Sequence, residues 1–71
     1  MNIIDVSNKI AYNQNHINGS INIPYEELMN NYRLYLNKKD IYYLYCKNGK
    51  LSKRASMILS SLGYKVFELK I

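Results

Sequence analysis

The sequence predicts a small α/β domain with a mostly parallel sheet and helices on both faces. Short apolar segments typical of strands alternate with segments whose apolar residues recur at helical spacing. The strongest strand candidate, residues 41–45, is an unbroken run of apolar and aromatic β-formers, which is typical of a central strand covered on both faces. Such strands are expected to be joined by right-handed crossover connections.

Chain length and composition favour one domain over residues 1–71. A chain of this size buries only about 60% of the surface of its unfolded state, so a thin core is expected. The single cysteine excludes an internal disulfide. Neither a leader nor an apolar run of roughly 18 residues is present, so we expect no secretion, no membrane span and a location in the reducing cytoplasm.

The first part of the chain is expected to supply two strands. Residues 2–6 form a short apolar run that ends in polar residues, with Asp5 near the carboxyl end of the strand. A helical turn capped by Ser7 is expected within residues 7–15. After a turn, the polar and apolar alternation of residues 20–23 predicts a second short strand.

The remaining elements follow from helix start and stop signals. Pro24 suits the first position of a helix expected over residues 25–36. Residues 51–62 carry apolar side chains at the spacing of an amphipathic helix, and Gly63 is the expected residue after its end. Residues 65–69 alternate as a last strand.

The charge pattern predicts a local anion site. Ten Lys and Arg residues against five Asp and Glu residues give a net charge of +5. Four of the bases fall close together, at Lys47, Lys50, Lys53 and Arg54, and the others are scattered. Binding to a nucleic acid duplex would need a longer stripe of positive charge along the phosphates, so no nucleic acid partner is expected.

The order of strand, Cys46, Gly-containing loop and helix start is the most informative local pattern. Backbone N–H groups in a tight loop and a first helical turn lack intrahelical partners, so they can converge on an anion. A free thiol titrates near about 8.5, and helix N-termini and nearby lysines lower that value and favour the nucleophilic thiolate. Gly49 suits a backbone that bends closely around a ligand or takes positive φ. Asp5 ends its strand at the same sheet edge, so the two loops are expected to be neighbours.

Simpler interpretations of these residues remain open. Cys46 is also explained as a small buried apolar residue at a strand end, and the loop lysines as a solvated helix start. His16 is more often a structural hydrogen-bond partner than a catalytic base in such a context. One cysteine and one histidine cannot complete a zinc site, so no metal is expected.

Two ordered motifs resemble the rhodanese family of single-domain sulfurtransferases. The first consists of Asp5-Val6, Tyr12, His16-Ile17, Gly19-Ser20 and Asn22-Ile23-Pro24. The second consists of Tyr45-Cys46, Gly49, Ser52, Ala55, Leu59, Gly63-Tyr64 and Val66. The order and spacing are similar to the family pattern over nearly the whole chain, so a rhodanese-like fold is expected.

The resemblance implies that Cys46 takes a sulfane sulfur from a small anionic donor such as thiosulfate. Cys46 would then carry the sulfur as a persulfide and pass it to a thiol or protein acceptor, without a cofactor. Asp5 and His16 match positions that organise the scaffold in the family. The expected substrate-binding loop consists of Lys47, Asn48, Gly49, Lys50, Leu51 and Ser52.

The sequence departs from the family pattern at positions that bind oxyanions. Leu51 stands where single-domain members usually carry the loop Arg, and Ser7 replaces another Arg. Leu51 also begins the apolar face of its helix, which favours a core position. Arg54, about one turn along, could partly replace the lost charge. Weak turnover of thiosulfate is therefore expected.

Two other functions remain open on the sequence alone. The first is a non-catalytic rhodanese-like module that binds a protein partner or regulates one, and the second is a thiol redox or anion-sensing protein. Compared with the family the chain looks trimmed, which would leave sheet edges exposed. A homodimer or a protein partner would cover such edges.

Overall fold

The computed structural model describes residues 1–71 and contains one sheet of parallel strands in the order β2-β1-β3-β4. The strands are β1 (Asn2–Asp5), β2 (Ile21–Asn22), β3 (Ile41–Tyr45) and β4 (Lys65–Glu68). The helices are α1 (Lys9–Gln14), α2 (Tyr25–Asn30), α3 (Tyr32–Tyr35) and α4 (Lys50–Ser61). The α/β class and the parallel sheet are confirmed. None of these helices has the length and apolar character needed to cross a membrane.

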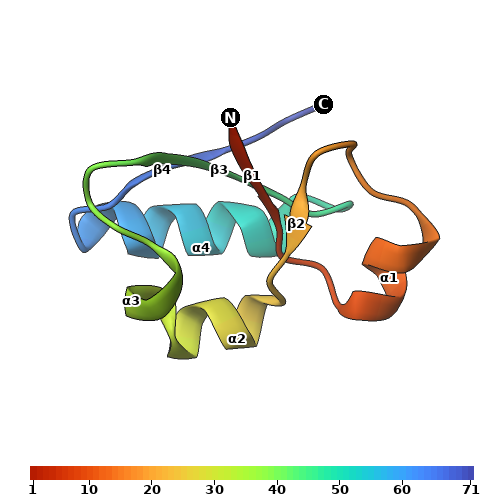
Figure 1. Cartoon of the computed structure of the whole chain (residues 1–71), viewed down its shortest axis with the longest axis horizontal. Helices are drawn as coiled ribbons and strands as arrows, with labels where there is room; N and C mark the ends of the chain where they lie inside the picture. Colours follow the sequence, from red (N-terminus) through yellow and green to blue (C-terminus); the bar gives the residue numbers. More distant parts are fainter.

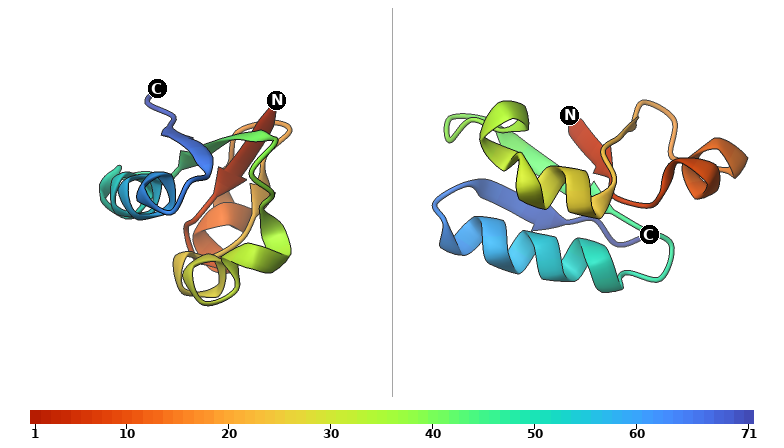
Figure 2. Two further views of the ribbon diagram at one scale, coloured as in Figure 1. Left: turned by 90° about the vertical axis from the view of Figure 1, so that its left-hand side faces the viewer. Right: turned by 90° about the horizontal axis from the view of Figure 1, so that it is seen from below.

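One face of the sheet packs against α2 and α4, and this layer holds the core (Figures 1 and 2). Ile4, Leu44 and Val66 lie on this face and are buried, because alternate residues of a strand point to the same side. Ile4 is paired with Leu44 in the register between β1 and β3. The buried core cluster consists of Ile4, Val6, Ile23, Leu28, Leu36, Tyr42, Leu44, Cys46, Ala55, Leu59, Tyr64 and Val66.

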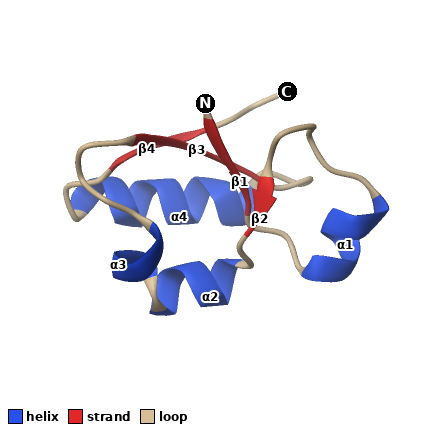
Figure 3. Ribbon diagram, viewed as in Figure 1, coloured by secondary structure: helices blue, strands red, loops and turns tan.

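The opposite face of the sheet is largely open. Ile3 and Tyr43 are only partly buried, and Phe67 is 52% exposed beside the Tyr43 ring. Helix α1 has no buried residue and lies beyond the carboxyl ends of the strands (Figure 3). This arrangement differs from the expectation of helices on both faces and of a strand 41–45 covered on both sides. Tyrosine accounts for the difference, because its ring favours strands while its hydroxyl tolerates water.

The helix expected over residues 25–36 is divided into α2 and α3 at Asn31. The Asn31 side chain donates to the backbone oxygen of Glu27, which competes with continuation of the helix. Pro24 is the N-cap of α2 and not its first helical residue. The Tyr35 hydroxyl donates to the Glu27 carboxylate at 2.8 Å, and this hydrogen bond raises the pKa of Tyr35 above its ordinary value.

The ends of the other helices lie close to the expected positions. Asn8, and not Ser7, caps α1 through its side-chain oxygen. The amphipathic helix begins and ends one residue earlier than predicted, as α4. Gly63 follows it with φ of +97°, and the Tyr64 N–H returns to the oxygen of Leu59. This is the glycine-dependent helix end that the sequence predicted.

Candidate active site

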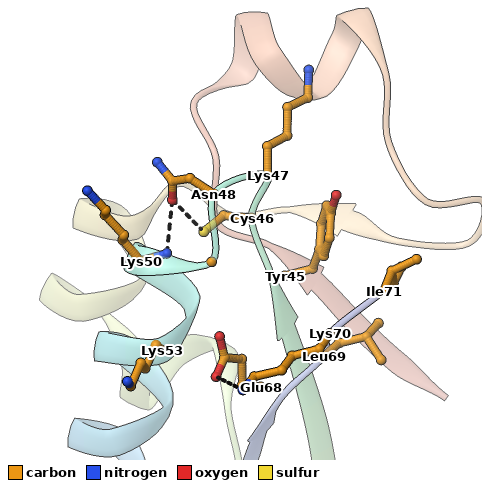
Figure 4. Close-up of a pocket in the computed structure, with 11 residues that line it drawn as sticks. Tyr45, Cys46, Lys47, Asn48, Lys50, Lys53, Glu68, Leu69, Lys70 and Ile71 are labelled. Carbon is orange, nitrogen blue, oxygen red and sulfur yellow. Dashed lines mark hydrogen bonds and ion pairs between the residues drawn. The ribbon is translucent and has the colours of Figure 1, made fainter.

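Cys46 follows β3 directly and lies at the carboxyl edge of the sheet, where it is 6% exposed. Its sulfur accepts a hydrogen bond from the Ser52 N–H at 3.3 Å. The Ser52 hydroxyl lies 3.4 Å from the sulfur. The Asn48 side-chain oxygen lies 3.6 Å from it (Figure 4). The sulfur therefore sits inside the loop, against the first turn of α4.

Gly49 turns this loop into the helix. Its φ of +75° lies in the left-handed region, which glycine adopts without the steric cost of a side chain. The Gly49 N–H donates to the oxygen of Cys46 at 3.2 Å, and the Lys53 N–H donates to the oxygen of Gly49 at 3.1 Å. The backbone thus wraps closely around the sulfur.

The loop also presents backbone donors that no protein group uses. The N–H groups of Lys47, Asn48 and Leu51 have no hydrogen-bond acceptor within the protein, whereas the Lys50 N–H donates to the Asn48 side chain at 2.9 Å. N–H groups at a helix start attract anions through their own polarity and the helix dipole. The loop can therefore bind an anion beside the Cys46 sulfur.

A pocket of about 410 Å³ opens beside Cys46. Four lysines line it, and all of them are exposed. Figure 4 shows the Lys47 side chain extending away from the sulfur, so this charge adds to the field around the pocket without a contact to Cys46. Glu68 is the one acidic residue in the lining. The lysines are Lys47, Lys50, Lys53 and Lys70.

The loop after β1 lies against the Cys46 loop, as the sequence predicted. The Asp5 carboxylate is 1% exposed and accepts the Ser7 N–H at 2.8 Å. The Asn22 side chain donates to the backbone oxygens of both Asp5 and Ser7. A smaller pocket of about 210 Å³ has Ser7 and Cys46 in its lining. Asp5 thus binds the backbone of its own loop and lines neither pocket that contains Cys46.

The sequence matches the family model described as Rhodanese-like domain over residues 1–70. The chain belongs to this family. It is 39% identical over 62 residues to thiosulfate sulfurtransferase PspE of Escherichia coli (strain K12). The match covers 86% of this chain and 60% of that protein, so the chain spans less than two thirds of the length of this relative.

Solved structures of similar proteins have the same fold as this rhodanese-like domain. SSP1007 of Staphylococcus saprophyticus superimposes with a TM-score of 0.87 at 28% identity, over 97% of this chain and 68% of that one. A rhodanese with anions from E. coli superimposes with a TM-score of 0.79 at 37% identity, over 94% of this chain and 80% of that one. The expected family resemblance and fold are therefore confirmed.

Three residues singled out in the sequence of this rhodanese-like domain do not line the larger of the two pockets that contain Cys46. His16 is exposed, stacks on the Tyr12 ring and makes a 2.8 Å hydrogen bond to the Tyr12 backbone oxygen. Arg54 is exposed and lines neither pocket that contains Cys46. Leu51 is partly buried against the core and lines only the smaller of the two pockets. His16 thus makes a structural hydrogen bond, and Leu51 packs against the core, as the simpler interpretations of these two residues describe.

The sequence interpretation missed the far wall of the larger pocket. Tyr45, Glu68, Leu69 and Ile71 line it together with the Cys46 loop. They lie there because β4 pairs with β3 and the Leu69 N–H donates to the Leu44 oxygen at 2.8 Å. The signal available in the sequence was that the strand expected at 65–69 would end at the same sheet edge as Cys46. The structure contains no cluster of three metal-ligating side chains.

Proposed function

We propose that this rhodanese-like domain transfers sulfane sulfur through a persulfide on Cys46. The observation that carries the proposal is the position of the Cys46 sulfur, which receives the Ser52 N–H inside a loop with unpaired backbone donors. Those N–H groups stabilise negative charge on the Cys46 sulfur and on a bound sulfur-donating substrate. Membership of the family and the similarity to a thiosulfate sulfurtransferase support this function.

The reaction consists of two transfers that need no net oxidant. The Cys46 thiolate attacks the outer sulfur of thiosulfate, a new S–S bond forms, and sulfite leaves with the electrons of the broken S–S bond. The acceptor, a thiol or a protein thiol, then attacks the outer sulfur of the persulfide and releases the Cys46 thiolate. A free thiol is required in each cycle, which suits the reducing cytoplasm.

We expect thiosulfate to be a slow donor for this domain. Leu51 is partly buried against the core, and no arginine lines either pocket that contains Cys46. Bidentate recognition of the sulfonate by a guanidinium is therefore absent, and exposed lysines act only as mobile point charges.

The burial of Cys46 favours one other function, a non-catalytic module that binds or regulates a protein partner. A cysteine residue that is 6% exposed can be inert when the loop does not open. The two functions differ in the reactivity of this thiol, so the test must measure that reactivity directly.

The test is the intact mass of the reduced protein after incubation with thiosulfate, beside a Cys46→Ser variant. A gain of one sulfur atom on the wild type alone, reversed by cyanide with release of thiocyanate, supports the sulfurtransferase. If no adduct forms and Cys46 also resists an alkylating reagent at neutral pH, the result contradicts persulfide transfer and favours the binding module.

A further inference from the structure

The pocket beside Cys46 is lined by one carboxylate, that of Glu68. Glu68 ends β4, its side chain is 18% exposed, and it lines the pocket together with the Cys46 loop. Its carboxylate reaches the loop backbone, since a Cβ built on Gly49 would lie 3.6 Å from a Glu68 oxygen. Figure 4 shows the carboxylate directed toward the loop. An anion that binds in this pocket is therefore repelled by the Glu68 carboxylate.

The lysine side chains around the pocket are more exposed than Glu68. Lys70 is the only base within ion-pair distance of Glu68, at 4.0 Å, and its side chain is 82% exposed. The three other lining lysines are exposed and have no ion-pair partner. Exposed charges on flexible side chains are screened by water and salt, whereas a mostly buried carboxylate is screened less. The repulsion between Glu68 and a bound anion is consequently reduced less by screening than the attraction from each exposed lysine.

We propose that Glu68 determines donor specificity by disfavouring dianions such as thiosulfate and favouring thiol persulfides, which carry at most one negative charge. The inference rests on the proposed function and names its substrate class. Coulomb repulsion grows in proportion to the charge of the donor, so the carboxylate raises the free energy of a bound dianion about twice as much as that of a monoanion.

The transfer from a thiol persulfide is balanced without a further reactant. The Cys46 thiolate attacks the terminal sulfur of R–S–SH, an S–S bond forms, and the S–S bond of the donor breaks. The leaving thiolate carries away the electron pair and takes a proton from water. The proton of the donor stays on the terminal sulfur of the Cys46 persulfide, which loses it to water.

The experiment compares Glu68→Gln with wild type by measuring the rate constant of Cys46 loading from thiosulfate and from the persulfide of 2-mercaptoethanol. Removing the carboxylate is expected to raise the ratio of the thiosulfate to the persulfide rate constant about fivefold. Glu26→Gln is the control, because it removes the same charge from an exposed position in the first turn of α2. The control should leave the ratio unchanged.

Glu68→Asp keeps the charge and should keep a ratio close to that of wild type, which separates charge from packing. An unchanged ratio in Glu68→Gln, or an equal rise for both donors, overturns the specificity role while persulfide formation itself stands. Loading of neither donor in either protein overturns the proposed function, and the role of Glu68 with it. Circular dichroism of each variant confirms that the fold is retained.

Discussion

Two loops meet at the carboxyl edge of the sheet, and they use their side chains in different ways. Side chains of the loop after β1 bind the backbone of the same segment, because the Asp5 carboxylate accepts the Ser7 N–H and the Asn8 side chain accepts the Ala11 N–H. The loop after β3 leaves the N–H groups of Lys47 and Asn48 without protein acceptors. A shared position at the sheet edge therefore does not imply a shared role.

The difference indicates which substitutions should affect stability and which should affect chemistry. A buried side chain that accepts backbone N–H groups of its own loop contributes to the free energy of unfolding, so its removal should lower stability. Unpaired backbone donors beside the Cys46 sulfur remain available to a ligand, so changes there should affect the chemistry. Four substitutions test this division.

The largest expected loss of stability is that of Asp5→Ala. The substitution leaves the Ser7 N–H without its acceptor and opens a cavity at a side chain that is 1% exposed, which should lower the free energy of unfolding by about 2 to 3 kcal/mol. Urea unfolding followed by circular dichroism measures this loss. Asp5→Asn retains an acceptor oxygen and should lose about 1 kcal/mol or less. Equal losses in the two variants would contradict the role given to the hydrogen bond.

Gly49→Ala should lower stability by about 1 kcal/mol, because alanine is strained at φ of +75°. Gly19→Ala is a matched control, since Gly19 has φ of +87° and no atom would lie within 4 Å of its new Cβ. Both variants should unfold at similarly reduced urea concentrations. Only Gly49→Ala should slow the loading of Cys46, and slowing by Gly19→Ala would argue against a specific role of the Cys46 loop.

Leu51→Arg should raise the rate of thiosulfate loading about fivefold, because a guanidinium at the helix start can bind the sulfonate in a bidentate manner. The rate of formation of the Cys46 adduct measures the gain. Met57→Arg adds the same charge at an exposed position further along α4 and should produce no gain. An unchanged rate in Leu51→Arg would mean that oxyanion binding does not limit loading.

The smallest effect is expected for Asn8→Ala, which removes the side-chain cap of α1 and should cost about 0.5 to 1 kcal/mol. Amide hydrogen exchange in α1 is the sensitive measurement, and faster exchange should be confined to that helix. Asn13→Ala, at an exposed position within α1, should leave exchange unchanged. Faster exchange throughout the sheet would show that the loop after β1 depends on this cap.

Local signals were sufficient to predict the Cys46 side of the site. A strand of β-formers, a cysteine, a glycine and an amphipathic helix specify the turn around the sulfur without long-range information, and Gly49 adopts the positive φ that was predicted. Gly63 could be placed for the same reason. These predictions depend on backbone sterics and helix periodicity, which are properties of neighbouring residues.

Features that depend on tertiary contacts could not be predicted in this way. Glu68 reaches the Cys46 loop only because Leu44 and Glu68 are in register between β3 and β4. The cap of α1 falls on Asn8 and not on Ser7, whose N–H is held by the Asp5 carboxylate. The sequence did not reveal the open face of the sheet, because β3 contains tyrosines and reads as an unbroken apolar run. Such a run does not show whether one face of a strand is covered or both.

The strand order has a consequence for how the chain folds. The two central strands, β1 and β3, come from distant parts of the sequence, since Asn2 pairs with Tyr42. β1 is therefore synthesised well before β3, and more than half of the chain must be made before the two can pair. β4 is synthesised after both. Because contacts of long sequence separation slow folding, assembly of this sheet is expected to be late and cooperative, despite the small size of the domain.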